Sequence, residues 1–104
     1  MHKPVPNHHF HQGKKAFESE EWDEAIRAFL ASIEEDPHRA ESYIALMKTY
    51  EAAAEESEDP ALFEQAVMTC RRARKLRLDA KQRAIVDEAA DRVSDKLREL
   101  REEK

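Results

Sequence analysis

Glycine and cysteine are almost missing from this chain of 104 residues, which has one of each and only four prolines. So few turn-forming residues exclude an all-β protein, because its many tight turns depend on glycine and proline. The lone cysteine, Cys70, excludes an internal disulfide and is compatible with a reducing compartment. The shortage of glycine also excludes a glycine-rich phosphate-binding loop.

Long apolar runs are missing as well. No stretch approaches the roughly 18 apolar residues that a membrane-spanning helix needs. No apolar segment follows residues 1–6, as a signal peptide would require. The sequence therefore predicts a cytoplasmic protein without membrane contact. A net charge of −5 disfavours nucleic acid as a partner.

Charged and apolar residues dominate the composition, at 39% and 40% of the chain. The apolar residues recur at intervals of three and four, which is the spacing of amphipathic helices and not of disordered segments. We therefore predict an ordered, all-α fold of about five helices in a single domain. The expected helices cover residues 7–18 and 22–35, a stretch that begins near 39, residues 60–76, and a stretch from 79 to near the C-terminus.

Polar residues mark where three of these helices should begin. Asn7 is expected to cap the first helix. Asp59 followed by Pro60 is typical of a helix start, because proline suits the first helical position. Asp79 and Gln82 have the spacing of a capping box, which predicts the start of the last helix.

Residues 13–37 carry small, aromatic and proline positions at the spacing of a helical-hairpin repeat. These positions are Gly13, Ala16, Phe17, Trp22, Ala25, Ile26, Phe29, Asp36 and Pro37. The segment resembles one tetratricopeptide repeat. In that family a small residue, here Gly13, lets the two helices of a hairpin approach closely. Ala25 and Phe29 match the second helix, and Pro37 matches the proline that ends it.

Residues 38–78 resemble a second, degenerate repeat of the same family. Tyr43, Leu46 and Tyr50 match its first helix. Met47 replaces the small residue of the family pattern, and Cys70 replaces a large aromatic one. The larger Met47 and the smaller Cys70 are a plausible exchange of side-chain volume. The resemblance divides one domain, 1–104, into a tail (1–6), repeat 1 (7–37), a degenerate repeat 2 with an insertion (38–78) and a capping helix (79–104). It implies antiparallel helical hairpins stacked as a short right-handed α-solenoid, with an up-and-down bundle as the alternative.

The same resemblance implies a function. In this family the first helices of successive hairpins line a concave groove, which binds a peptide or a helix of a partner protein. The positions that match are Asn7, Phe10, Lys14, Phe17, Glu41, Ile44, Lys48 and Glu51. Ala45 stands where the family's carboxylate clamp has an asparagine, which disfavours that class of ligand. The alternative function is a structural module that self-associates as a homodimer.

Basic residues concentrate between positions 71 and 83, where Asp79 is the single acid. This basic strip consists of Arg71, Arg72, Arg74, Lys75, Arg77, Lys81 and Arg83. One interpretation is a solvated face balanced by acidic turns elsewhere. The other is a binding surface for an acidic protein segment or for RNA. No aromatic residue is interleaved with the basic ones, which weakens the RNA version.

No group of residues indicates catalysis. Cys70 lies on the apolar face of its expected helix, which favours a buried hydrophobic role over that of a nucleophile. His8 and His11 share one side of a helix, close to His2 and His9, but no acid or cysteine nearby completes a metal site. We therefore predict no enzymatic activity, no metal and no cofactor.

Overall fold

Five helices joined by short turns make up residues 7–102, the part of the chain that the computed structural model describes. They are α1 (His8–Glu18), α2 (Trp22–Glu35), α3 (Ala40–Ser57), α4 (Pro60–Arg74) and α5 (Ala80–Glu102). Residues 7–102 contain no β-strand, so the predicted all-α fold of five helices is confirmed. The expected tail, residues 1–6, lies outside the described residues.

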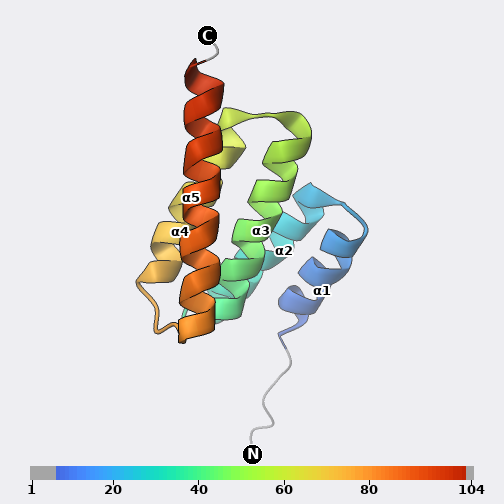
Figure 1. Cartoon of the computed structure of the whole chain (residues 1–104). Coiled ribbons are helices and arrows are strands. Elements are labelled where there is room, and N and C mark those ends of the chain that lie inside the picture. Colours follow the sequence, from blue (N-terminus) through green and yellow to red (C-terminus); the bar gives the residue numbers. More distant parts are fainter. Residues whose placement is uncertain (1–6, 103–104) are drawn as a thin grey trace, which may run out of the picture.

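Each helix packs against the next one along the chain, which makes the molecule a stack of helical hairpins (Figure 1). Figure 1 shows α1, α3 and α5 on the near side of the stack, with α2 and α4 behind them. The central helix is α3, which contacts α1 and α5 as well as α2 and α4. One face of the molecule is therefore formed by α1, α3 and α5.

The caps predicted from the sequence are present at three helix starts. The Asn7 side chain accepts a hydrogen bond from the backbone N–H three residues on, at 3.0 Å. Asp59 does the same for the N–H two residues on, at 2.9 Å, and Pro60 follows it in the first turn. Asp79 and Gln82 form a reciprocal capping box, each side chain accepting from the other's backbone N–H at 2.7 and 3.0 Å.

The predicted end of the fourth helix is wrong by two residues. Instead of continuing to position 76, α4 ends at Arg74. The N–H groups of Lys75 and Leu76 donate to carbonyls three residues back, at 3.2 and 3.0 Å, so the chain closes in a tighter turn. The alanine-rich end of α3 is helical as far as Ser57.

Side chains from all five helices form one apolar core. Its largest fully buried side chains are Phe29, Leu46, Met47, Phe63, Val86 and Val93. Gly13 of α1 faces the ring of Phe29, and a Cβ on Gly13 would lie 2.5 Å from the nearest ring carbon. This close approach of α1 and α2 is the role that the sequence predicts for Gly13. Within residues 7–102, no helix is both long and apolar enough to cross a membrane.

Candidate functional site

A groove lies between α1, α3 and the first turns of α5. It consists of two adjoining hollows that share Lys14, Ala45 and Lys48. The remaining lining residues are Phe10, Phe17, Glu18, Phe29, Glu41, Ile44, Asp79, Lys81, Gln82 and Ile85. We refer to this set as the groove. Six of the eight residues that the resemblance to tetratricopeptide repeats assigns to a groove are among them.

Helical spacing explains how the two walls form. On α1, Phe10, Lys14 and Phe17 are separated by four and three residues, so they lie on one side of the helix. On α3, Ile44 and Lys48 have the same relation. Because α1 and α3 lie on the same face of the stack, these two sides border a common groove.

Apolar side chains form the floor of the groove. Phe17, Ile44 and Ile85 are half-buried and pack against the core. Phe10 is only 9% exposed, so it belongs more to the core than to the open floor. Its ring is also covered by two cations, the Arg39 guanidinium at 4.6 Å and the Lys14 ammonium at 5.7 Å from the ring centroid. The floor is therefore apolar but small.

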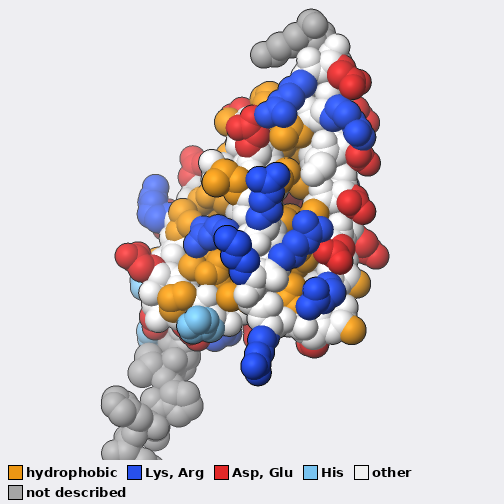
Figure 2. Space-filling view, turned by 90° about the vertical axis from the view of Figure 1, so that its left-hand side faces the viewer, with side chains coloured by type: hydrophobic (Ala, Val, Ile, Leu, Met, Phe, Trp, Pro, Cys, Tyr) orange, Lys and Arg blue, Asp and Glu red, His pale blue; other side chains and the backbone are white. Residues whose placement is uncertain are grey.

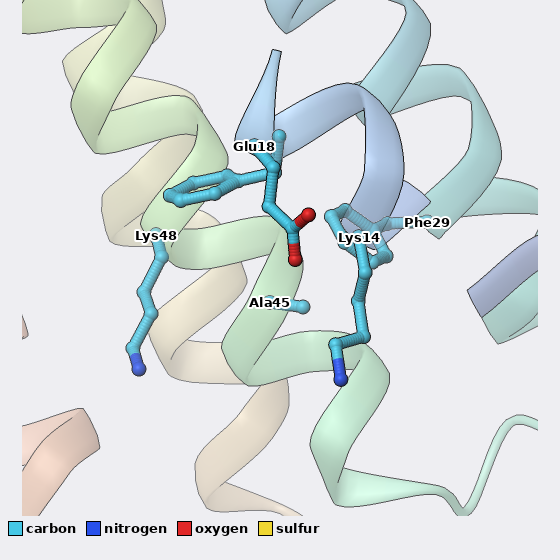
Figure 3. A pocket seen from close by; sticks show the side chains of 6 residues that line it. Lys14, Glu18, Phe29, Ala45 and Lys48 are labelled. Carbon is cyan, nitrogen blue, oxygen red and sulfur yellow. The ribbon is translucent and has the colours of Figure 1, made fainter. Parts of the chain in front are cut away.

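Three lysines and three acids lie along the rim of the groove. Figure 3 shows Lys14 and Lys48 on opposite sides of the first hollow, with the Glu18 carboxylate pointing between them. Lys81 borders the second hollow from α5. Within residues 7–102, none of these three lysines forms an ion pair. Two of the acids at the rim are already engaged. Glu41 lies 3.6 Å from the Arg39 guanidinium, and Asp79 caps α5.

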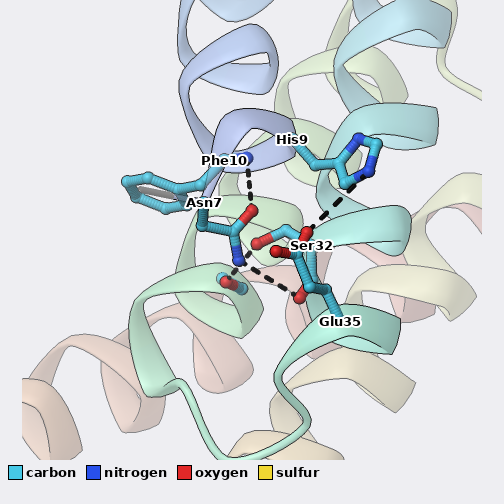
Figure 4. Close-up of polar contacts among 6 residues, drawn as sticks. Asn7, His9, Phe10, Ser32 and Glu35 are labelled. Atoms are coloured by element: carbon cyan, nitrogen blue, oxygen red, sulfur yellow. Dashed lines mark hydrogen bonds and ion pairs between the residues drawn. The ribbon is translucent and has the colours of Figure 1, made fainter. Parts of the chain in front are cut away.

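Asn7, predicted as a groove residue, lies outside it and joins helices instead (Figure 4). It is buried at the start of α1, where its side-chain amide donates to the Ser32 carbonyl of α2 at 3.5 Å. The Ser32 hydroxyl is hydrogen-bonded to that of Ser42 on α3, at 2.7 Å. On the surface nearby, His9 of α1 lies 3.8 Å from Glu35 of α2. Asn7 thus has a structural role.

Glu51, the other residue outside the groove, connects α3 to α5. Its carboxylate accepts two hydrogen bonds from the Arg92 guanidinium, at 2.5 and 2.8 Å. The Glu51 side chain is 10% exposed, whereas that of Arg92 is 55% exposed. The hydrogen bond to Glu51 raises the pKa of Arg92, so the guanidinium stays charged at every ordinary pH.

The contribution of α5 to the groove was not predicted from the sequence, which indicated only a capping helix for residues 79–104. Lys81, Gln82 and Ile85 of α5 close the second hollow. The available signal is the spacing of Lys81 and Ile85, which puts a cation and an apolar residue on one helix side. Which neighbour that side faces depends on how α5 docks.

All seven residues of the basic strip are exposed. They occupy the last turn of α4, the following turn and the first turns of α5. Figure 2 views the molecule from the side of α4 and α5, and shows Lys and Arg side chains spread over the middle of this face. Arg74 forms an ion pair with Asp87 of α5 at 2.9 Å, and the Arg72 guanidinium lies 5.3 Å from the ring centroid of Tyr43.

Cys70 lies in the core, whereas the histidines among residues 7–102 lie on the surface. Cys70 is 1% exposed, and burial raises the pKa of its thiol to about 11, so the thiol stays protonated at neutral pH. His8, His9 and His11 are exposed. Between positions 7 and 102, no three potential metal-binding side chains come together. His2 lies outside the described residues.

Comparison with protein-family models and with curated proteins gives no match, and comparison with solved structures gives none either. The resemblance to tetratricopeptide repeats thus depends on the residues quoted from 13–37 and on the less regular match that follows them. The stack of helical hairpins is the architecture that such repeats would form.

Proposed function

We propose that the chain is a protein-binding module of the tetratricopeptide type, whose groove binds a partner segment with apolar and acidic side chains. One observation supports this most directly. The half-buried floor of Phe17, Ile44 and Ile85 is bordered by Lys14, Lys48 and Lys81, three lysines without a carboxylate partner in residues 7–102.

The shape of the groove favours an elongated partner, either a helix or an extended peptide. Its walls, α1 and α3, run side by side, and a groove between two helices accommodates a helix or an extended peptide. Contact with Phe17 and Ile44 would supply most of the affinity, because burial of apolar surface is the main favourable term. The lysines would set the orientation and the preference for acidic partners. We place this binding in the cytoplasm, where the Cys70 thiol would remain reduced.

The test is capture from native extract followed by mapping of the binding segment as a synthetic peptide. We expect Ile44→Glu to weaken binding of that peptide about tenfold or more, because it puts a charge on the apolar floor. Amide chemical shifts of the labelled protein should change mainly at Lys14, Phe17, Lys48 and Ile85 when the peptide is added.

Leu30→Glu is the matched control. Leu30 is an exposed leucine on α2, 40% accessible and outside the groove, so the same change of charge should leave peptide binding within about twofold. Equal loss in both variants would reject the groove as the binding site. Shift changes confined to α2 and α4 would reject it as well.

A further inference from the structure

Arginines inside and outside the basic strip differ in their partners. The five outside it, in the described chain, each lie within reach of a carboxylate. They are Arg27, Arg39, Arg92, Arg98 and Arg101, at distances of 3.4, 3.6, 2.5, 2.5 and 2.5 Å. Inside the strip, Arg74 is the one arginine with a carboxylate partner among residues 7–102. Within residues 7–102, the arginines that lack a carboxylate partner are therefore all on this face.

Local structure explains why some of the basic residues occur in the strip, but not all of them. Cations in the last turn of α4 are favoured by the partial negative charge at a helix C-terminus. Arg74 has Asp87, and Arg72 packs over the ring of Tyr43. None of these reasons applies to Arg77 in the turn or to Arg83 near the start of α5, where the helix end is itself partly positive.

The concentration of like charge raises the free energy of the folded state, and a bound anion would lower it. The protein has 23 acidic residues against 18 basic ones, so there was no shortage of carboxylates to pair with. We infer that the basic strip is a second binding surface, which adjoins the groove at Lys81, and that it binds an acidic segment of a partner protein. Lys81 borders both surfaces, so one partner could occupy them together.

An acidic protein segment fits this face better than a nucleic acid does. Binding of single-stranded RNA depends on aromatic side chains that stack with bases, and residues 71–83 contain none. The net charge of −5 also repels a long polyanion at a distance, while a short acidic segment contacts only the strip.

The test uses labelled poly-L-glutamate of about 20 residues, long enough when extended to cross the strip. Binding to the full chain would be followed by fluorescence anisotropy at several salt concentrations. We expect affinity to fall steeply as salt rises, because the contacts are between exposed charges. The variant Arg71→Glu/Arg77→Glu/Arg83→Glu should bind about tenfold more weakly or worse, since each reversal turns attraction into repulsion.

Two controls isolate the strip from other causes. Lys15→Glu/Arg27→Glu/Lys96→Glu changes the net charge equally at positions outside the strip, and Lys96 lines a hollow with Glu51 and Arg92 that contains no strip residue. This variant should bind within about twofold of the parent. Ile44→Glu should also bind within about twofold, which separates the strip from the groove. Circular dichroism and melting of each variant exclude unfolding as the cause of a loss.

Four results would overturn the inference. The parent could fail to bind poly-L-glutamate at low salt, or both triple variants could lose binding equally, which would show an effect of net charge alone. Tighter binding of single-stranded poly-U than of poly-L-glutamate at the same salt concentration would reject an acidic protein segment in favour of RNA. Loss in Ile44→Glu alone would move the anion site to the groove, without rejecting the proposed function.

Discussion

The contact between Gly13 and Phe29 decides how closely α1 and α2 pack. Three carbons of the Phe29 ring lie 2.5, 2.6 and 2.8 Å from the position that a Cβ on Gly13 would occupy. Glycine inside a helix costs about 1 kcal/mol relative to alanine, so packing and not helix propensity explains it here. The repeat pattern predicts a close approach at Gly13, but it does not specify which ring atoms fill the space.

We therefore expect Gly13→Ala to lower the free energy of unfolding by about 1–3 kcal/mol, although alanine is the better helix former. The added methyl group must displace a rigid aromatic ring or push the two helices apart. Urea denaturation of parent and variant measures the difference. In a Phe29→Leu background the same substitution should cost much less, because the ring is gone. A Gly13→Ala variant as stable as the parent would show that the hairpin has room at this position.

Individual helices are predicted well from the sequence where their determinants are local. Asn7, Asp59 and Asp79 cap helices as expected, because a cap bonds to N–H groups two or three residues away. Docking between helices is different. Glu51 and Arg92 are 41 residues apart, and the chain offers Arg92 many other carboxylates, so no sequence pattern identifies this pair. The same reason explains why the α5 side of the groove was missed.

The Glu51–Arg92 pair should make a measurable contribution to the docking of α5 on α3. Arg92→Ala would leave the nearly buried Glu51 carboxylate without its partner, and we expect a loss of about 1–3 kcal/mol in unfolding free energy. Arg74→Ala is the matched control, because the pair of Arg74 with Asp87 joins α4 to α5 in an exposed setting. The loss of unfolding free energy in Arg74→Ala should stay below about 1 kcal/mol. Equal losses in thermal or urea unfolding would mean that the burial of Glu51 does not matter.

The whole molecule is a short stack of two helical hairpins, α1–α2 and α3–α4, and α5 packs against the second hairpin. Val86, Ala89 and Val93 of α5 are fully buried, so this helix covers apolar surface that α3 and α4 would otherwise expose. The contacts of α5 with α4 and α3 close this end of the stack. Two large apolar side chains are exposed in the described chain, Leu30 of α2 with 40% of its surface accessible and Met68 of α4 with 52%. Each of these is a single side chain and not a broad patch.

Scattered apolar residues of this kind do not require a second copy of the chain to cover them, so we expect a monomer. Light scattering should then give a molar mass near 12.1 kDa, and the melting temperature should not depend on protein concentration. Ile44→Glu and Leu30→Glu distinguish the alternatives if a dimer forms. A dimer dissolved by Ile44→Glu would place the self-contact in the groove and remove it as a partner site. A dimer dissolved only by Leu30→Glu would place the contact on α2 and leave the groove free, because the two surfaces lie on different helices.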